Sequence, residues 1–594
     1  GYSQSREKQA MHITTRGGEK RREMVDLHSQ TDVSEVSGLY QGYKMSTQRS
    51  MDRVDETAMN YDLIEDVLTL LLENASTNTS ILPPQGGKDL EKFCSGAVLI
   101  FLPGMGEIRT LTSRLSGSRV FGNKRRYDVI PMHSTLSPQD QKRAFSQPKP
   151  GCRKLILSTN ICETSVTIPD VVCVIDSGLV REVRQDKRYA TSKLVLDWCS
   201  RASTKQRAGR AGRVQPGICC KLYSSNTVEH VMKAQTMPEL QRVPLEEVCL
   251  SILGGNLSNS CADFLEQAPQ PPSETAVKLA LNLLKEVGAI EVSAETQQLT
   301  PLGEHLAKIP VHVRLGKMLI FGCIFRCLDP ILTIVSGLSC KSPFVTSANS
   351  TSDVTAIHNK FRDIESDFLT ITNLWKSFQM NLRENNTRDR GRGFCRKNFL
   401  SWSAMMEIGD MRRQCLELLT QIGFVQGKCK EDSLAKSIYN ENGLDDRLIH
   451  SVICAGLYGN VAHAIKERPD DPPSLWHRQE RLLFHSSSTN HKKRNLPSNW
   501  ILFHAKFATA RTTVAATSPI HDSALMMFGG TMVVKHLERK VVIDDWIEIP
   551  VAAQKAVLLK ELRGRLEVLL KKLIESTELK QDEELVEVVT KVLS

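Results

Sequence analysis

The stretch KLILSTNICETSVTIPDVVCVIDSG, residues 154–178, decides the fold of the first half of the chain. It holds two short apolar runs separated by a polar loop, and each run ends in hydroxyl, acidic or glycine residues. Short apolar runs of this kind are typical of strands that are buried on both faces of a parallel sheet. The stretch therefore predicts two neighbouring strands joined by a loop rich in hydroxyl groups.

The same pattern extends toward the N-terminus. AVLIFLPG (97–104) and YDVIPMHS (127–134) are similar runs, and each is followed by a segment with helical periodicity, 107–115 and 138–145. Strands that alternate with helices indicate a doubly wound α/β domain, which we expect over residues 90–222. Further upstream, the apolar spacing of 60–74 predicts a helix.

The second half of the chain changes character twice. After Val243 it is helical, with a two-strand pattern in EVSAETQQLT (291–300), which suggests a winged-helix module followed by a helical bundle to residue 424. Residues 430–550 return to short strands and predict a small all-β barrel. An amphipathic helix is expected from residue 551, and residues 1–58 have the composition of a linker or insertion with little core.

Composition excludes several classes of protein. Of the 594 residues, 41% are apolar and 24% are charged, which is ordinary for a folded domain and rules out collagen-like or wholly disordered chains. The 16 cysteines show no C-x-x-C spacing, so reduced thiols are expected rather than a disulfide framework, and no metal site is predicted. The longest apolar stretch, Met318–Leu338, is broken by charged residues and proline and is too interrupted for a membrane span. The first 30 residues are too polar for a signal peptide, and a start at Gly1 suggests a fragment or processed product.

Positive charge is concentrated in one part of the chain. Residues 181–213 contain ten Lys or Arg against three acidic residues, a net charge of +7, whereas the whole chain carries +10. The segment ends in QRAGRAGR (206–213), where Arg210 and Arg213 would share a face if the segment were helical. Paired guanidinium groups suit a triphosphate. The alternatives are an exposed basic turn and a solvated charged face, but the concentration favours a polyanionic partner such as nucleic acid.

The loop STNICETSVTIPD (158–170) lies about forty residues before the arginines. A strand that leads into hydroxyl groups can bind phosphate through backbone N–H groups and side chains. The alternative is a capped loop between strand and helix with no ligand.

Nine motifs follow one another along the chain. They are LIFLPG (99–104), HSTLSPQDQKRAF (133–145), STNICETSVTIPD (158–170), VIDSG (174–178) and QRAGRAGR (206–213), then VPLEEVCLSI (243–252), LTPLGEHLAKIPV (299–311), SDFLT (366–370) and LMMFGG (525–530). The first five, in this order, resemble the second RecA-like domain of the DEAH/RHA group of superfamily-2 RNA helicases. The later motifs resemble the winged-helix, ratchet and OB-fold domains that follow it in that family. Within the family the chain resembles the cytoplasmic group that contains the ribosome-scanning and G-quadruplex helicases.

The resemblance implies a multidomain chain, an α/β RecA-like parallel sheet followed by winged-helix, helical-bundle and all-β OB-fold domains. The implied boundaries are a linker or insertion at 1–58, the second RecA-like domain at 59–222, the winged helix at 223–301, the ratchet-like bundle at 302–424, the OB-fold at 425–550 and the C-terminal amphipathic helix at 551–594.

The resemblance also implies an ATP site. Gln206 would orient the attacking water, and Arg210 and Arg213 would act as arginine fingers. Phe145 would stack on adenine, with a core Phe that closes a helix as the alternative, and Thr167 would lie near the ribose. ATP and Mg²⁺ would both be held mainly by a domain upstream of Gly1.

RNA contacts are implied at three places. Thr159 and Asn160 would lie along the RNA backbone, and 181–200 would form a β-hairpin that separates or grips strands. In the OB-fold, the loop HSSSTN (485–490) would face RNA. The residues expected to contact RNA are Thr159, Asn160, Arg181, Arg184, Lys187, Arg188, His485, Ser487 and Asn490.

The sequence departs from the family pattern in one major way. It contains neither G-x-x-x-x-G-K-[ST] nor a DEAH-like box, so we expect no ATP hydrolysis by this chain alone. Smaller departures are Cys162 where the family usually has Ala, Pro169 where many members have Asp, and Ser486 where Pro is usual. The change at Pro169 bears on the expected ribose contact.

The leading interpretation is therefore the C-terminal part of an ATP-dependent RNA helicase, whose ATP cleft is completed by an upstream RecA domain. A non-enzymatic RNA-binding relative without a motor half, and a DNA helicase of related architecture, are the alternatives. The expected partner is single-stranded or structured RNA, with a ribosome or another ribonucleoprotein also open and no membrane. The resemblance favours the cytoplasm, with the nucleus as a second location.

Overall fold

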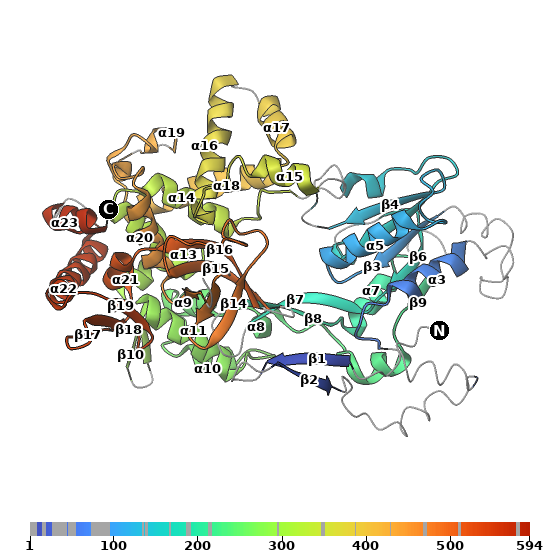
Figure 1. Cartoon of the computed structure of the whole chain (residues 1–594), viewed down its shortest axis with the longest axis horizontal. Helices are drawn as coiled ribbons and strands as arrows, with labels where there is room; N and C mark the ends of the chain where they lie inside the picture. The colour runs from blue at the N-terminus through green and yellow to red at the C-terminus, as the bar shows by residue number, and fades with distance from the viewer. Residues whose placement is uncertain are drawn as a thin grey trace. The chain divides into compact units, whose positions relative to one another are not determined.

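The computed structural model describes residues 9–14, 20–25, 44, 55–72, 96–133, 136, 141–164, 168–185, 192–211, 217–293, 296–345, 351–385, 388–427, 429, 431–466, 472–508, 512–577 and 583–593. The chain divides into two compact units (Figure 1). Unit 1 comprises residues 1–181 and 196–236, and unit 2 comprises 182–195 and 237–594.

Unit 1 is built on a parallel sheet with the strand order β4-β5-β3-β6-β9. Every neighbouring pair in this order is parallel. The four predicted strands are present, and β9 joins them at the edge beside β6. The strands are β3 (Ala97–Phe101), β4 (Tyr127–Met132), β5 (Arg153–Ser158), β6 (Val171–Asp176) and β9 (Ile218–Lys221).

Alternate residues of each strand pack on opposite faces of this sheet. Val98 and Ile100 of β3 pack against helices α3 (Tyr61–Leu72) and α5 (Met105–Gly117). On the other face, Leu99 packs with residues of the short 3-10 turns η1 (Arg143–Phe145) and η2 (Asn160–Cys162). Burial on both faces explains why these strands read as continuous apolar runs.

The helices predicted in this unit are α3 and α5. Of the helix expected over 138–145, residues 137–140 lie outside the described residues, and the described end is the 3-10 turn η1. The hairpin expected over 181–200 is formed by β7 (Leu179–Gln185) and β8 (Ser192–Trp198). Helix α7 (Arg201–Ala208) follows it directly, and the π-helical turn η3 (Thr227–Val231) lies further on.

The stretch 1–58, expected to be a linker or insertion with little core, contains one antiparallel pair of strands that was not predicted. Strand β1 (Gln9–Thr14) pairs antiparallel with β2 (Lys20–Val25), with Gln9 opposite Val25. These strands are bonded only to each other within the described residues. Because a backbone ladder needs no apolar periodicity, the hydrophobic pattern gave no signal for it.

Unit 2 begins with helices and a small antiparallel pair, as the winged-helix prediction required. Helix α11 is capped by the Ser273 hydroxyl, which accepts from the backbone N–H of Ala276, and it ends at Gly288 with a φ of +84°. Strands β10 and β11 follow, with Ile290 opposite Leu299. The elements are α8 (Glu239–Arg242), α9 (Glu246–Gly254), α10 (Cys261–Glu266), α11 (Glu274–Val287), β10 (Ile290–Ser293), β11 (Thr296–Leu299) and α12 (Pro301–Leu306).

The long apolar stretch 318–338 belongs to adjacent core helices. Helix α13 ends at Ile324, Arg326 turns the chain with a φ of +56°, and α14 begins at Leu328. None of the described helices has the length and apolar character that crossing a bilayer requires. The bundle contains α13 (Val313–Ile324), α14 (Leu328–Ser339), α15 (Thr351–His358), α16 (Asp367–Asn385), α17 (Arg388–Lys397), α18 (Trp402–Ile422), α19 (Glu431–Leu434) and η4 (Ile438–Asn440).

The predicted barrel is present as a closed sheet in the order β12-β13-β14-β16-β15. The stretch around it is less uniform than an all-β region: α20 precedes the barrel and packs against α13, and α21 follows it. The elements are α20 (Asp446–Leu457), β12 (Val461–Ile465), β13 (Ser474–His477), β14 (Glu480–Phe484), β15 (Trp500–Ala508), β16 (Thr512–Ile520) and α21 (Asp522–Phe528).

The C-terminal elements differ from the sequence-based expectation. The strands expected to complete the barrel near residue 540 form a separate antiparallel sheet, β17-β18-β19. The single amphipathic helix expected over 551–594 is divided into α22 and α23. These elements are β17 (Met532–Lys535), β18 (Lys540–Ile543), β19 (Ile547–Pro550), α22 (Ala553–Ser576) and α23 (Glu583–Leu593).

Candidate nucleotide site and nucleic-acid interface

Helix α7 carries the first residues of QRAGRAGR. The Ser200 hydroxyl caps its N-terminus by accepting from the backbone N–H of Ser203 at 3.1 Å, a contact of the kind that stabilises a helix by about 1 kcal/mol. The helix ends at Ala208. Arg210 therefore lies beyond it, so the helical condition under which Arg210 and Arg213 would share a face is not met at Arg210. Arg213 itself lies outside the described residues.

Arg207, the first arginine of the motif, is not available to a ligand. Its side chain is buried, with Nη1 2.9 Å from Oδ1 of Asp176 and Nε 3.0 Å from Oε2 of Glu163. Its guanidinium also lies 5.0 Å from the ring centroid of Phe101. Burial alone would lower the pKa of Arg207, but the two carboxylates more than offset it, so the pKa lies above its ordinary value. The Tyr223 hydroxyl donates to the other carboxylate oxygen of Asp176 at 2.9 Å.

Glu163 links the hydroxyl-rich loop to the arginine motif. Its carboxylate is bound to Arg207, and its backbone carbonyl accepts a hydrogen bond from Nη2 of half-buried Arg210. Gln206 is exposed on the last turn of α7. Glu163 thus fixes the position of Arg210, and Gln206, next to buried Arg207 on α7, has its side chain open to solvent.

Phe145 lies at the surface at the end of η1. Buried Lys154 fixes this turn from below, because its Nζ donates to the carbonyls of Ala144 at 2.8 Å and Ser146 at 3.0 Å. The Phe145 side chain is 41% exposed. The alternative of a core Phe is therefore wrong, and an anchored, exposed ring is suited to stacking on a flat ligand.

The residues expected along the RNA backbone have different exposures. Asn160 is exposed at the start of η2, whereas Thr159 is buried and its N–H points to the carbonyl of Met132 at 3.4 Å. The Asn160 side chain can therefore reach a ligand more readily than that of Thr159. Thr167 lies outside the described residues.

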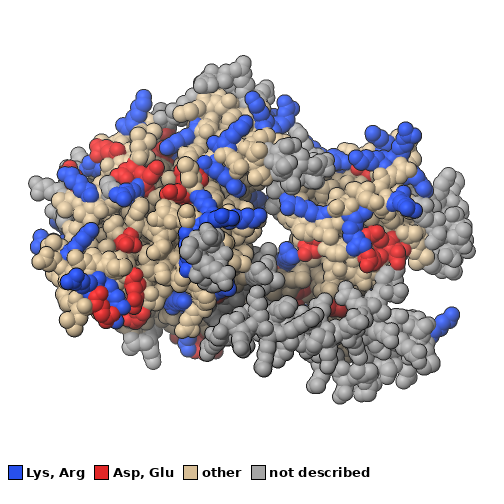
Figure 2. Space-filling view, in the orientation of Figure 1, with Lys and Arg blue, Asp and Glu red and all other residues tan. Residues whose placement is uncertain are grey.

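The basic hairpin is described only at its base. Arg181 of β7 forms an ion pair with Glu107 of α5 at 2.7 Å, and its side chain is 30% exposed. Arg184 lies on β7, whereas Lys187 and Arg188 lie outside the described residues. On the face drawn in Figure 2, Lys and Arg side chains are spread over both units, so the positive charge is not confined to 181–213.

The barrel loop, residues 485–493, follows β14. His485 Nδ1 accepts from the Ser487 N–H at 3.2 Å, which places the ring proton on Nε2. Burial lowers the pKa of His485, and His491 adds to this effect while Asp367 opposes it. The imidazole is therefore neutral at pH 7, and exposed Ser487 lies beside it, with its Oγ 2.7 Å from Nδ1.

Asn490 does not fit its predicted role. The side chain is fully buried, and its amide donates to the carbonyl of Glu365 at 2.9 Å and to Thr517 Oγ1 at 3.1 Å. A buried amide with these partners cannot reach a nucleic acid strand. Asn490 instead holds the loop in place, whereas His485 and Ser487 lie nearer the surface.

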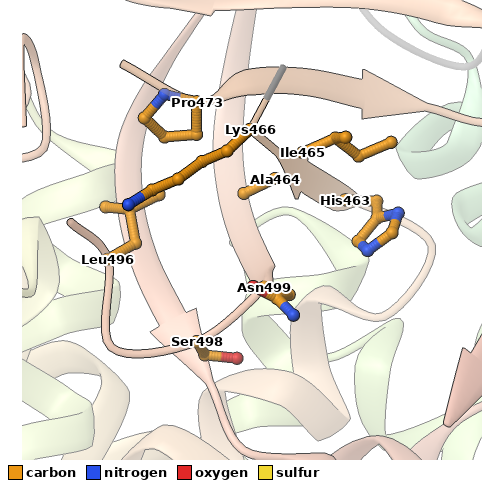
Figure 3. A pocket seen from close by; sticks show the side chains of 8 residues that line it. All are labelled: His463, Ala464, Ile465, Lys466, Pro473, Leu496, Ser498 and Asn499. Carbon is orange, nitrogen blue, oxygen red and sulfur yellow. The ribbon is translucent and has the colours of Figure 1, made fainter. Parts of the chain in front are cut away.

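A cavity of about 270 Å³ lies on the barrel at the C-terminal end of β12 (Figure 3). His463 and Asn499 line it, and the Lys466 side chain extends across it toward Leu496. The His463 ring is stacked on Trp500, with 4.4 Å between centroids and 21° between planes. An imidazole face beside a cation and an amide suits a flat group with hydrogen-bonding edges. No sequence motif pointed to this cavity.

Comparison with known domain families places helicase modules in order along the chain. The helicase conserved C-terminal domain matches residues 88–215, and the winged-helix and ratchet-like parts of the helicase associated domain match 280–311 and 312–397. An OB-fold matches 449–532, and the C-terminal domain in RNA helicases matches 539–594. This series agrees with the parallel sheet, wing, bundle and closed barrel described above.

The chain belongs to the DEAH/RHA helicase family. It corresponds to the C-terminal part of the proteins of that family, as its motifs indicated. The ATP-dependent RNA helicase dhx29 of Xenopus laevis is 35% identical over 98% of the chain and 42% of its own length. The putative ATP-dependent RNA helicase DHX57 of Homo sapiens is 34% identical over 91% of the chain and 40% of its own length. The ATP-dependent DNA/RNA helicase DHX36 of Bos taurus is 36% identical over 81% of the chain and 47% of its own length. The chain therefore spans less than half the length of these relatives.

Several residues that shape this DEAH/RHA site were missed by sequence reasoning. Glu163 and Asp176 lie inside motifs that were recognised. Asp176 is the last residue of the buried strand β6 and Glu163 lies in the loop after β5, and an acidic residue at such a place is the signal that could have identified them. Asp367 lies in SDFLT, a motif recognised by resemblance and given no role.

Proposed function

We propose that this chain forms one wall of the ATP site of an ATP-dependent RNA helicase and carries part of its RNA path. The observation that carries the proposal is that unit 1 presents exposed Gln206, half-buried Arg210 bound to Glu163, and the exposed ring of Phe145 on an anchored turn. Ala144 and Ala211, which adjoin Phe145 and Arg210 in the chain, belong to one core cluster on the same face of the sheet. Family membership gives these residues their context, and the curated relatives are named ATP-dependent helicases.

The side chains fit a nucleotide from one side. An exposed aromatic ring can cover a base, and a guanidinium can neutralise phosphate oxygens. In this proposal Phe145 stacks on adenine, Thr167 lies near the ribose, and Arg210 and Arg213 stabilise charge on the phosphates while Gln206 orients water. The opposite side of the site, including most of the contacts to Mg²⁺, is assigned to the other RecA domain of the family.

RNA binding is assigned to both units. Asn160 and the backbone of Thr159 would follow the RNA strand in unit 1. The β7–β8 hairpin, whose residues 182–195 belong to unit 2, would add contacts from Arg181, Arg184, Lys187 and Arg188. In unit 2, His485 and Ser487 of the barrel loop would contact RNA. Since these contacts combine charge with hydrogen bonds to the backbone, affinity should fall steeply with salt. The assignment of the whole protein to the cytoplasm, and of ribonucleoprotein partners to it, belongs to the same proposal.

The second candidate is an RNA-binding protein without ATPase activity. It is favoured by one observation, the lack of both a G-x-x-x-x-G-K-[ST] segment and a DEAH-like box in the sequence. The two candidates differ in whether the chain supports RNA-stimulated ATP hydrolysis when it is joined to an ATP-binding RecA domain.

The test compares this chain alone with a longer polypeptide in which an ATP-binding RecA domain of the family precedes it. We expect RNA binding by both, and RNA-stimulated ATP hydrolysis by the longer polypeptide only. In the longer polypeptide, Phe145→Ala should raise the KM for ATP about fivefold with little change in kcat, since a stacking contact is worth about 1 kcal/mol. Val231→Ala, at another exposed apolar residue of unit 1, is the matched control. RNA binding without hydrolysis in the longer polypeptide would support the second candidate.

A further inference from the structure

The segment that leads into helix α16 contacts the barrel loop. Asp367, the first residue of α16, accepts a hydrogen bond from the backbone N–H of Thr489 at 2.6 Å through Oδ1. Its Oδ2 accepts from the N–H of Thr517 on β16 at 2.8 Å, and the Thr517 hydroxyl lies 3.2 Å from the same oxygen. One carboxylate of the helical bundle thus binds backbone groups of the barrel loop and of the strand behind it.

Other residues of the segment 362–367 reinforce this contact. The carbonyl of Glu365 accepts from the buried amide of Asn490 at 2.9 Å, and that of Ile364 accepts from Nζ of Lys493. In the reverse direction, Nη2 of Arg362 lies 3.4 Å from the carbonyl of Ser487. The contacts extend along the barrel loop from residue 487 to residue 493.

Asp367 is itself rigidly held. Ser366 caps the helix, since its hydroxyl accepts from the N–H of Leu369 at 3.3 Å, and Ser366 is fully buried. Asp363 accepts from the N–H groups of Glu365 and Ser366, both at 2.9 Å, which fixes the turn before the helix. Helix α16 also packs against β16. The carboxylate therefore moves with α16.

Within the barrel, the loop is bound to β16 through Ser488 Oγ, 2.7 Å from Thr517 Oγ1, and through the His485 N–H, which donates to the carbonyl of Val514 at 2.8 Å. Residues 485–493 form neither helix nor strand, and loops without regular structure take their conformation from side-chain contacts. Hydrogen bonds from backbone N–H groups to a carboxylate are about twice as strong as those between neutral groups. Asp367 thus adds a charge-assisted hydrogen bond, at the Thr489 N–H, to the part of the loop next to His485 and Ser487.

We propose that Asp367 is a positioning residue that holds the barrel loop in its RNA-binding conformation and thereby couples the grip on RNA to the position of helix α16. The proposal rests on the proposed function, in that the barrel loop contacts RNA. It assigns to the SDFLT motif the task of joining the ratchet-like bundle to the OB-fold at the point where RNA is bound.

The test uses Asp367→Asn in the full chain. Asparagine keeps the size of the side chain, but it offers one acceptor oxygen and turns an NH₂ group toward a backbone N–H, so one of the two contacts is lost. Glu365→Gln is the matched control, because it removes the same charge two residues away at an exposed side chain whose carbonyl alone contacts the loop.

Hydrogen exchange is measured first, because it needs no RNA. We expect faster exchange over 485–493 and at Thr517 in Asp367→Asn, with exchange in α14 and β12 unchanged, and wild-type exchange in Glu365→Gln. Affinity for a single-stranded oligoribonucleotide is then expected to fall about tenfold in Asp367→Asn. Glu365→Gln should bind as tightly as the wild type or more tightly, since it removes a negative charge near RNA.

Coupling is tested with Ser487→Ala. Alone it should weaken RNA binding severalfold, and in the Asp367→Asn background it should add little, because the loop is already displaced. Unchanged exchange in Asp367→Asn would overturn the positioning role, as would loosened exchange with full RNA affinity. A wild-type chain that binds no RNA would instead overturn the proposed function. If Asp367→Asn unfolds, Arg362→Ala tests the same loop through a peripheral contact and should give a smaller change in the same direction.

Discussion

In unit 1, α7 is anchored through Arg207, whose buried guanidinium meets the carboxylates of Asp176 and Glu163. In unit 2, the barrel loop is anchored through the Thr489 N–H, which donates to Asp367, and through the amide of Asn490. A buried ion pair fails as a whole when one partner is removed, because the remaining charge is left unpaired. A network of mostly neutral hydrogen bonds loses stability in smaller steps. We infer that the loss of one partner costs more stability in the arginine motif than in the barrel loop.

The largest effect is expected at Arg210, where the arginine motif would contact the nucleotide. In a polypeptide with both RecA domains, Arg210→Ala should lower RNA-stimulated ATP hydrolysis about a thousandfold or more while nucleotide binding changes only severalfold. Steady-state ATPase assays and nucleotide titration measure the two quantities. Lys205→Ala, at an exposed basic residue of α7, should leave both near the wild-type values. Full turnover in Arg210→Ala would contradict its assignment as a finger.

The anchor itself is tested by stability. Arg207→Ala leaves Asp176 and Glu163 buried without their cation, so unit 1 should lose about 3 to 5 kcal/mol of unfolding free energy. Urea unfolding followed by circular dichroism checks this value. Arg201→Ala, at the exposed start of the same helix, should change stability by less than about 0.5 kcal/mol. Equal losses in the two variants would show that the buried pairs contribute nothing special.

The free energy of unfolding of unit 2 should decrease in acid. In unit 2, burial lowers the pKa of His312 to about 3 and those of His450 and His504 to about 4, whereas an unfolded histidine titrates near 6.5. The unfolded state therefore binds more protons below about pH 6.5, and stability falls as the pH falls toward the folded-state values, by up to about 1.4 kcal/mol per histidine and pH unit.

Tryptophan fluorescence can follow this loss, because five of the six tryptophans lie between residues 375 and 546. The urea midpoint reported by fluorescence should be lower at pH 5 than at pH 7, and His450→Gln should reduce the difference. A midpoint that does not depend on pH would contradict the burial of these neutral rings.

The smallest effects are expected at the barrel loop. Asn490→Ala removes the donors to Glu365 and Thr517 and should cost about 1 to 3 kcal/mol of stability. Ser487→Ala, at an exposed neighbour, should leave stability unchanged and lower RNA affinity. Thermal unfolding and RNA titration of both variants separate the two roles. The reverse pattern would return Asn490 to the RNA-contacting group.

The fold was predictable where hydrophobic periodicity carries the information. The buried strands of unit 1, helices α3 and α5 and the wing at β10–β11 all follow from apolar spacing. The pairing of β1 with β2 and the separate β17–β19 sheet depend on backbone ladders and on which strands meet in space, and spacing does not encode either. At the sites, the sequence pointed to the arginine motif that contains Arg207 and to Asn490 as an RNA contact. Only burial, which depends on distant partners such as Asp176 and Glu365, decides that they face inward.

Lys154 has a practical consequence. Its side chain is 2% exposed, and its ammonium group holds the turn that carries Phe145 and lies 2.9 Å from Asp170, whereas Lys205 is exposed on α7. An amine-reactive label should therefore modify Lys205 faster than Lys154, which is protected for as long as the turn stays closed. The ratio of the two labelled peptides in a mass spectrum, followed over time, would then report the rate at which this part of unit 1 opens. It can be measured in a cell extract without purifying the protein.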